Sequence, residues 1–550
     1  MTSEHPPWPQ KLSVSKHGMI ATQQADATQA GLEILGAGGN AIDAAVAAAF
    51  ALGVCEPHAS GLGGQTMMMI HTAEPRRTFA VDGSSRAPSR ATIERVPKTA
   101  MRLRGHRATT VPSTPAVLGY ILAQYGSLPL SRVLEPAIRL AETGYRITAL
   151  QRRLQKREKK HWADGNAARF FLKEGREPYK TGEMFRQPVL ARTLSILARK
   201  GIEEFYQGQM AAQIAEDMAR NDGFIRKDDL ALIPHPIERR PVSCRFGGWR
   251  VMTFPPPGAG RTLVEMLNII SQFDPGDYDP LKLKGLLLLC EVIRRAQLDR
   301  GDRPFEPNFY PQVQDRRMLT VDYARLVARQ IRSRLRTRGN TGGETTHLSV
   351  MDNQGNVVAL TQSVERVYGS FVVHPDLGFL YNNYMSAFEY EDITHPYYLR
   401  PNGVPWASVA PTIIFRGKRP YIAIGSPGSE RIASSVLQVL LRIAGGQAPL
   451  DAVSAPRIHC TVGGEVHLEA SRIRNDLPEF LRRRGFEIVE KEPFAFYMGC
   501  VQMVMREGKE LAGVADPRRD GSAAGPTVPV RSAASRQDTP DVPGKQDFET

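Results

Sequence analysis

A short run that begins at Gly343 combines residue types that could make a peptide bond cleave itself. The run reads Gly-Glu-Thr-Thr-His-Leu-Ser-Val and is followed shortly by Asp352. If the Glu344–Thr345 bond is cut, Thr345 becomes an N-terminal residue that carries a hydroxyl nucleophile and a free α-amine. An α-amine has an ordinary pKa of about 7.7–8.0, so a useful fraction is unprotonated near neutral pH. One residue would then supply both the nucleophile and its base.

A glycine-containing loop further along the chain could stabilise negative charge. Residues 425–429 (Gly-Ser-Pro-Gly-Ser) connect a predicted strand, 420–425, to a predicted helix, 430–443. Consecutive backbone N–H groups at a helix N-terminus suit a developing oxyanion. An ordinary turn that enters a helix is the alternative. Beside a threonine nucleophile, the oxyanion hole is the favoured interpretation.

His347 invites a second interpretation, a serine–histidine–aspartate triad with Ser349 and Asp352. Strand alternation places His347 and Ser349 on the same face as Thr345. Successive side chains on one face project in parallel rather than toward one another, so we expect a hydrogen-bonded structural histidine. The 12 histidines of the chain show no spacing typical of metal sites, and no metal is expected.

The hairpin that would carry Thr345 is predicted from a turn signature at 352–355 (Asp-Asn-Gln-Gly) between two strand-like segments. If residues 352 and 355 pair across a two-residue loop, Thr345 lies opposite Gln362. Ser363 is then diagonal to Thr345 and within reach of its side chain.

The remaining elements predict a mixed α+β protein. A helix of small residues, capped by Asn40, precedes two strands and a polar loop; a mainly helical region and further strands follow, and a tail poor in large apolar residues is predicted to be disordered. The predicted ranges are 41–50 for the helix, 65–71 and 77–81 for the strands, 82–88 for the loop, 115–300 for the helical region, 411–415, 466–470 and 498–505 for the later strands, and 521–550 for the tail.

Length and composition bound the class of protein. A chain of 550 residues, 42% hydrophobic and 23% charged, is globular and can form more than one domain. Its five scattered cysteines predict free thiols rather than a disulfide framework or a zinc site. Neither a signal peptide nor a membrane-spanning segment is visible, which predicts a cytoplasmic protein.

The net charge of +14 raises the question of nucleic-acid binding. Two basic clusters, at 152–160 and 329–338, contribute to this charge. No aromatic residues are interleaved with the basic ones, and no nucleic-acid-binding motif accompanies them. We therefore expect solvated surfaces, with neither nucleic acid nor membrane as a partner.

Taken together, six segments resemble the gamma-glutamyltranspeptidase family of N-terminal-nucleophile hydrolases. The resemblance implies a four-layer αββα sandwich, and a precursor that cuts itself into a large subunit, 1–344, and a small subunit, 345–520. The two subunits would stay associated as a heterodimer, with no cofactor. The segments are 18–64, 345–352, 382–385, 410–412, 425–431 and 515–519.

The resemblance also implies roles for individual residues near the bond that is cut. Thr345 corresponds to the processing site and catalytic nucleophile. Ser363 stands where the family has a threonine that supports the nucleophile. Gly428 and Ser429 stand at the oxyanion pair, normally two glycines, and a backbone N–H remains at both.

The positions that would bind the substrate's α-carboxylate depart in part from the family. Ser408 matches the second of two serines that bind this group, whereas Ala407 replaces the first. The family arginine that binds the carboxylate aligns with Ser84. Arg86 lies two residues away and is predicted to take its place.

The positions that would hold the glutamyl α-ammonium depart further. Glu365, Tyr384 and Ala387 stand in for an Asn, a Gln or Glu, and an Asp. A buried ammonium without a counter-charge is costly, and only Glu365 could compensate. The sequence thus predicts a γ-glutamyl hydrolase or transferase acting on compounds such as glutathione. One alternative is a related amidohydrolase of another acyl group, of the oxamate or cephalosporin-acylase type. A non-catalytic binding protein with the same fold is the third.

Overall fold

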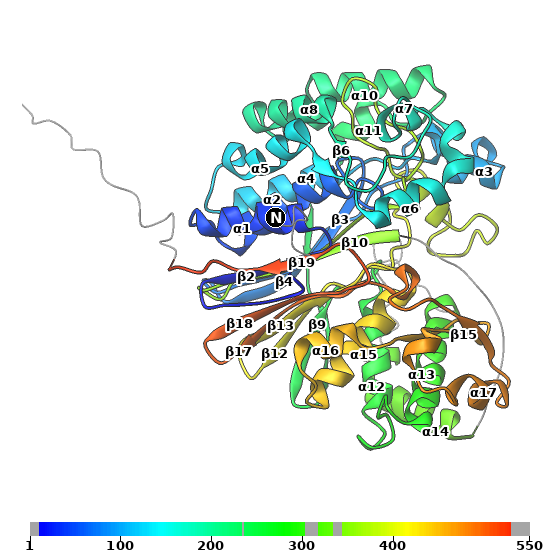
Figure 1. Ribbon diagram of the computed structural model, residues 1–550. Coiled ribbons are helices and arrows are strands. Elements are labelled where there is room, and N and C mark those ends of the chain that lie inside the picture. Colours follow the sequence, from blue (N-terminus) through cyan, green and yellow to red (C-terminus); the bar gives the residue numbers. More distant parts are fainter. Residues whose placement is uncertain (1–9, 234–235, 303–316, 334–343, 530–550) are drawn as a thin grey trace, which may run out of the picture.

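The computed structural model describes residues 10–233, 236–302, 317–333 and 344–529. Two stacked sheets form its centre, and helices cover the outer face of each (Figure 1). This arrangement confirms the predicted four-layer αββα sandwich. The helices over the first sheet include α1 (Ala25–Gly36), α2 (Ala41–Cys55), α4 (Thr114–Tyr125), α5 (Leu130–Thr143), α8 (Pro188–Lys200) and α10 (Gln209–Arg220), and those over the second include α12 (Gly260–Ile270), α13 (Leu283–Asp302), α14 (Val321–Ser333), α15 (Arg431–Ala444) and α16 (Pro449–Ser454).

Each central sheet has seven antiparallel strands among the described residues. The first runs in the order β19 (Ser522–Ala524), β2 (Gly18–Thr22), β10 (Glu344–Asp352), β11 (Val357–Glu365), β3 (Gln65–Thr72), β4 (Arg77–Gly83) and β7 (Ile237–Arg239). The second runs in the order β1 (Leu12–Ser15), β18 (Glu510–Ala515), β17 (Gln502–Glu507), β13 (Arg419–Gly425), β12 (Thr412–Arg416), β9 (Trp249–Thr253) and β8 (Val242–Phe246).

Shorter elements complete the fold. Two small sheets pair β14 (Ile458–Cys460), β15 (Glu465–Leu468) and β16 (Glu487–Glu490), and β5 (Tyr145–Arg146) with β6 (Met184–Phe185). The other α-helices are α3 (Thr99–Leu103), α6 (Ala149–Arg157), α7 (Ala168–Phe171), α9 (Glu203–Tyr206), α11 (Lys227–Ala231) and α17 (Leu477–Arg482).

The small-residue helix α2 positions the hairpin that carries Thr345. Asn40 caps it as predicted, in a reciprocal capping box with Asp43. Its alanine-rich surface is buried almost all round, which lets it approach β10 and β11 closely. At its first turn the amide of Ala41 donates to Oδ2 of Asp352 at 3.0 Å, and near its middle Nε2 of Gln362 donates to the carbonyl of Ala49 at 3.0 Å.

The tip of this hairpin differs from the prediction. Met351 pairs with Val357, and the amide of Asp352 donates to the carbonyl of Asn356 at 3.1 Å. Three residues therefore form the tip instead of two. The carboxylate of Asp352 holds it by accepting from the amides of Gly355 and Asn356, both at 2.8 Å, and Gly355 supplies the positive φ of 102° that the tip requires.

This longer tip shifts the register by one residue, so the predicted pairing of Thr345 with Gln362 is wrong. Thr346 faces Gln362, and Glu344 faces Glu365. Thr345 lies in the irregularity between these two pairs. A bulge of this kind redirects a side chain away from the regular alternation of the strand.

The predicted disordered tail begins too early. Ser522–Ala524 forms β19 and pairs with β2. A residue with a side chain would not fit at Gly521, because its Cβ would lie 2.2 Å from the carbonyl oxygen of Thr22. Small residues are needed here for close approach, so the lack of large apolar groups gave a false signal of disorder. Residues 530–550 lie outside the described residues, as do Arg334, Arg336 and Arg338 of the second basic cluster.

Other predictions of the sequence are met in part. The region from 115 to 300 is mainly helical, but it also contains β8 and β9 at the edge of the second sheet. All five cysteines are free thiols, as predicted. Among the described helices, none combines the length and the apolar character needed to span a membrane.

Candidate active site

Thr345 lies near the start of β10 and is only 6% exposed. Its carbonyl oxygen accepts a hydrogen bond from Nη1 of Arg519 at 3.3 Å. The same guanidinium group lies 3.5 Å from Oε1 of Glu56, and Oε2 of Glu56 accepts from the hydroxyl of Thr346 at 2.5 Å. A buried ion pair therefore holds the main chain on the C-terminal side of the Glu344–Thr345 bond.

Burial governs the protonation of this ion pair. It raises the pKa of Glu56 to about 7, against the opposing effects of Arg519 and the Thr346 hydroxyl. Arg519 is held in turn by Gln23, whose Oε1 is 3.2 Å from Nη1, and by the ring of Phe496, 4.1 Å from the guanidinium carbon. Segments that precede and follow Thr345 in sequence, around Glu56 and Arg519, thus meet beside it.

The predicted oxyanion loop begins beside β10. The ring of His347 packs so closely on Gly425 that an added Cβ there would lie 2.2 Å from it. Gly428 and Ser429 have φ values of 121° and 52°. Within the described part of the chain, neither amide donates a hydrogen bond. The oxyanion hole at these two amides is still a prediction.

His347 is a structural residue, as expected. It is fully buried, and its ring nitrogens contact the hydroxyl of Thr361 at 2.8 Å and that of Ser349 at 3.1 Å. Burial lowers the pKa of His347 to about 3, so the ring is neutral. The contact with Ser349 contradicts the expectation that the two side chains would not meet, because the ring, held against Gly425, reaches along the strand.

The described residues do not form the alternative triad. The carboxylate of Asp352 is occupied by the amide of Ala41 and by groups at the hairpin tip. The hydroxyl of Ser349 donates to the carbonyl of Gln502 at 3.2 Å.

Ser363 lies on β11 in a buried polar network. Its Oγ accepts from the amide of Glu365 at 2.8 Å, and it pairs across the sheet with Gln65. Burial, and then the nearby Glu365, raise the pKa of Tyr384 well above its usual value, while Ser363 and Gln65 interact with its hydroxyl. Tyr384 is therefore a hydrogen-bond donor at neutral pH.

Ser85 joins this network, and sequence reasoning missed it. Oε1 of Gln65 accepts from both the amide of Ser85, at 2.8 Å, and its hydroxyl, at 3.0 Å.

The two neighbours of Ser85 in sequence point elsewhere. The hydroxyl of Ser84 donates to Oδ1 of Asp82 at 2.6 Å, and Nη1 of Arg86 donates to the carbonyl of Asn402 at 3.2 Å. No described contact joins Arg86 to Ser408, so its predicted role is still a prediction.

Arg300, at the end of α13, is the second residue that the sequence did not reveal. It is buried, and it donates to the carbonyl of Ala407 at 2.8 Å and to the hydroxyl of Ser408 at 3.3 Å. Its guanidinium carbon lies 4.8 Å from the centroid of the Trp406 ring. Burial lowers the pKa of Arg300 to about 10, which leaves it charged at neutral pH.

Glu365 lies within electrostatic reach of Arg300. Burial raises the pKa of Glu365 to about 7, and Arg366 and Arg300 oppose this rise. Ala387 is held beside the same segment, because its carbonyl accepts from the amide of Trp406 at 3.1 Å. The structure thus brings together Glu365, Ala387 and Ser408, and adds a cation, Arg300, that the resemblance did not predict.

Comparisons with known proteins find similar chains that match over most of their length. The sequence model of the Gamma-glutamyltranspeptidase family matches residues 27–526. The chain is 34% identical to the Glutathione hydrolase proenzyme of Escherichia coli (strain K12), over 92% of this chain and 91% of the relative. It is 32% identical to the Acylase ACY 1 proenzyme of Pseudomonas sp. (strain SE83), over 93% and 94%. A solved cephalosporin acylase from Bacillus halodurans superposes with a TM-score of 0.86 at 31% identity, over 96% of this chain and 99% of that one.

Proposed function

Because the chain belongs to the gamma-glutamyltranspeptidase family, we propose that it is a self-processing threonine amide hydrolase and acyltransferase that cleaves γ-glutamyl compounds such as glutathione. In the precursor, the hydroxyl of Thr345 attacks the carbonyl carbon of Glu344 and the peptide C–N bond breaks. Water then hydrolyses the resulting ester. The first step frees the α-amine of Thr345, and the hydrolysis frees the carboxylate of Glu344 and restores the Thr345 hydroxyl.

In the mature enzyme, Thr345 works in two steps. Its hydroxyl attacks the carbonyl of the substrate amide, while its α-amine accepts the hydroxyl proton and delivers it to the leaving amine. The oxyanion is held by the amides of Gly428 and Ser429, and Ser363 supports the nucleophile. Water or an acceptor amine then attacks the acyl ester and releases the acyl group.

The observation that carries this proposal is the placement of Thr345. Thr345 lies at a bulge near the start of β10, and Arg519 anchors its carbonyl oxygen. Two residues further along, His347 packs against Gly425, the first residue of the oxyanion loop. Relatives named as proenzymes support the expected heterodimer of a large subunit, 1–344, and a small subunit that begins at Thr345.

Arg300 supports a second candidate within the same reaction class. A cation next to Ser408 favours an acyl group that ends in a carboxylate. The position of Ala387 lacks the carboxylate that would balance an α-ammonium. A dicarboxylic acyl group without an ammonium, such as glutaryl, fits these two features better than glutamyl does.

The two candidates can be separated with purified, cleaved enzyme. It is incubated with glutathione, with glutaryl-4-nitroanilide and with oxamate, and the products are measured. Release of glutamate from glutathione, absent with Thr345→Ala, supports the γ-glutamyl activity. Turnover of the glutaryl amide without turnover of glutathione contradicts it and supports the second candidate.

A further inference from the structure

The ion pair of Arg519 and Glu56 places a buried positive charge beside the residue that has to act as a base. Nη1 of Arg519 donates to the carbonyl oxygen of Thr345 at 3.3 Å, and the α-nitrogen of that residue is roughly 3 Å from its own carbonyl oxygen. Arg519 is 3% exposed, so water screens its charge only weakly. A guanidinium keeps its proton at every pH at which an enzyme of this kind would work.

A positive charge in this position changes the strength of the base. It disfavours the protonated form of a nearby amine, and the amine therefore releases its proton at a lower pH. An ordinary α-amine has a pKa of about 7.7–8.0, so most of it is protonated at pH 7. The α-amine of Thr345 can accept the proton of the Thr345 hydroxyl only when it is unprotonated. The guanidinium thus increases the fraction of molecules that are ready to react near neutral pH.

Glu56 opposes this effect, but only in part of the pH range. Its Oε1 lies 3.5 Å from Nη1 of Arg519, and its Oε2 accepts from the hydroxyl of Thr346 at 2.5 Å. Burial raises the pKa of Glu56 to about 7. Above that pH the carboxylate offsets the guanidinium, whereas below it the carboxyl group is neutral and the guanidinium acts alone. Protonation of the amine is therefore opposed most strongly in acidic solution, where it would otherwise inactivate the enzyme.

Other ionisable groups surround Thr345 and its ion pair, and they do not reproduce this arrangement. Burial raises the pKa of the Cys55 thiol and lowers the pKa of His58 and of His347 to about 3, so these three are uncharged. Within the described part of the chain, Arg519 is the only charged side chain that bonds to Thr345. The surrounding groups are Cys55 and His58 next to Glu56, Glu365 at the end of β11, His347 on β10, and Lys11 and Asp520 next to Arg519.

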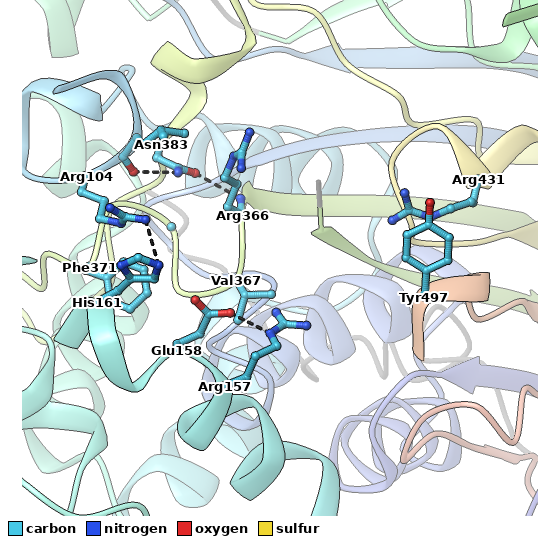
Figure 2. A pocket seen from close by; sticks show the side chains of 12 residues that line it. Arg104, Arg157, Glu158, His161, Arg366, Val367, Phe371, Asn383, Arg431 and Tyr497 are labelled. Carbon is cyan, nitrogen blue, oxygen red and sulfur yellow. Dashed lines mark hydrogen bonds and ion pairs between the residues drawn. The ribbon is translucent and has the colours of Figure 1, made fainter. Parts of the chain in front are cut away.

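Further cations line a neighbouring cavity. Figure 2 shows Arg104, Arg157, Arg366 and Arg431 around it. Arg157 and Arg366 are exposed, so solvent screens their charges. Among the described contacts, none joins these four arginines to Thr345. A change at Arg519 can therefore be separated from a change at the cavity.

We propose that the Arg519–Glu56 pair sets the proton affinity of the Thr345 α-amine, in addition to holding the main chain. The guanidinium weakens the amine as a base, and the carboxylate limits this effect. Both are positioning residues, because they act on the reaction through Thr345 and need no contact with the substrate. The inference rests on the proposed function, since it assumes that the cut frees this amine and that the amine serves as the base.

The pH dependence of kcat/KM tests this role, because its acid limb reports protonation of the base in the free enzyme. Cut and purified enzyme is assayed with glutathione and with glutaryl-4-nitroanilide. Arg519→Gln removes the cation and should move the acid limb to higher pH, by about one pH unit. Glu56→Gln removes the counter-charge and should move it to lower pH. The second shift should be smaller, because Glu56 is ionised only above about pH 7.

The opposite signs of the two shifts separate charge from a general loosening of the site. Both substitutions disturb the same contacts, so loosening alone would move the acid limb in the same direction in both. Glu56→Gln preserves the shape of the side chain, and Arg519 is still held by Gln23 and by the ring of Phe496. An acid limb that moves to higher pH in Glu56→Gln, or that is unchanged in both variants, would overturn the inference.

Two further variants serve as controls. Arg519→Lys keeps the charge but loses the planar guanidinium, so it should retain the acid limb of wild-type enzyme even if kcat falls. A role in anchoring alone would give lysine and glutamine the same profile. Arg220→Gln removes one positive charge from an exposed residue on α10, where Arg220 pairs with Glu216, and should leave the profile unchanged. If Arg519→Gln is not cut, the direction of the shift in Glu56→Gln decides between the two outcomes.

A titration of the amine itself needs no turnover. Acetic anhydride acetylates an amine only in its unprotonated form, and mass spectrometry of the tryptic peptide 345–366 measures acetylation of the Thr345 nitrogen at each pH. The midpoint should lie below about 7.7 in wild-type enzyme and rise in Arg519→Gln. Equal midpoints would refute the inference. If the midpoints differ as expected but neither substrate is cleaved, the proposed acyl specificity fails and the role of the ion pair stands.

Discussion

Nη1 of Arg519 donates to the carbonyl oxygen of Thr345 across 174 positions of sequence, at 3.3 Å. The same arginine balances the buried carboxylate of Glu56. Breaking a buried ion pair by removing one partner typically costs about 3–5 kcal/mol, because a charge is left unpaired. The pair therefore couples the stability of the fold to the position of the residue that is cut.

Arg519→Gln should slow the conversion of precursor to subunits by at least about tenfold, because the main chain of Thr345 loses its anchor. Gel electrophoresis over time measures this rate. The double variant Glu56→Gln/Arg519→Gln removes both charges of the pair. Compared with Arg519→Gln, it should regain more of the free energy of unfolding than of the processing rate. Normal processing in a folded Arg519→Gln variant would contradict the anchoring role.

Thr345→Ala should give a single uncut band near 60.9 kDa, because no hydroxyl remains to attack Glu344. Thr345→Ser keeps the hydroxyl and should still be cut, more slowly. Mass spectrometry of wild-type enzyme should find Thr345 at the N-terminus of the smaller fragment. A cut in Thr345→Ala at this bond is the outcome that the mechanism does not allow.

Gly428→Ala keeps the backbone N–H but should displace it, and should lower kcat by about 10²-fold, the cost when one oxyanion donor no longer acts. At φ 121° an alanine is strained, and its Cβ would lie 3.3 Å from the Cα of Gly499. Ser429→Gly is the matched comparison, because it keeps the amide and tolerates φ 52°, and it should retain activity. Equal losses in both variants would argue against a backbone role.

Glu365 should make ligand binding depend on pH. Its pKa of about 7 means that it is neutral at pH 6 and ionised at pH 8. Glutamate, which carries an ammonium, should gain affinity relative to glutarate over this interval, by up to about tenfold. Titration of the Thr345 amine should affect both ligands alike, so the ratio of their inhibition constants removes its effect. Glu365→Gln should abolish the change, and a pH-independent ratio in wild-type enzyme would remove Glu365 from the site.

His347→Gln tests the structural role of the histidine. The folded-state pKa of about 3 lies below the ordinary 6.5, so the unfolded chain takes up a proton first as the pH falls. The stability that wild-type protein has over the variant should therefore shrink by about 2 kcal/mol from pH 7 to pH 5. Denaturant unfolding measures this difference. Correctly cut variant should keep activity within about tenfold, whereas a triad histidine would not.

The sequence predicts the small-residue helix and the hairpin that carries Thr345, because both are encoded locally, whereas the four-layer arrangement was implied by the resemblance to the family. The Thr-Thr-His run, the Asn40 cap and the alanine-rich α2 each specify their own conformation. The register of the β10–β11 hairpin was wrong by one residue because two turn lengths suit the same Asp-Asn-Gln-Gly sequence. The backbone bonds of the Asp352 carboxylate decide between them.

The substrate side was harder to predict because its charges come from distant segments. Arg300 belongs to a helix that covers the second sheet, yet it contacts Ser408. Nothing in its local sequence separates it from the other arginines of α13. Ser85 was missed for a simpler reason. The resemblance pointed to the positions of Ser84 and Arg86, whereas Ser85, which follows the end of β4, is the residue that donates to Gln65.

The order of strands in the two sheets also determines when the cut can occur. In the first sheet β10 lies between β2, which precedes residue 345 in sequence, and β11, which follows it. On its other side β11 pairs with β3, which again precedes residue 345. In the second sheet β1 is bound to β18, and β9 to β12. Neither fragment could complete a sheet by itself, so backbone scission must come after tertiary assembly. Co-expressing two separately translated halves should yield little native enzyme compared with the continuous chain.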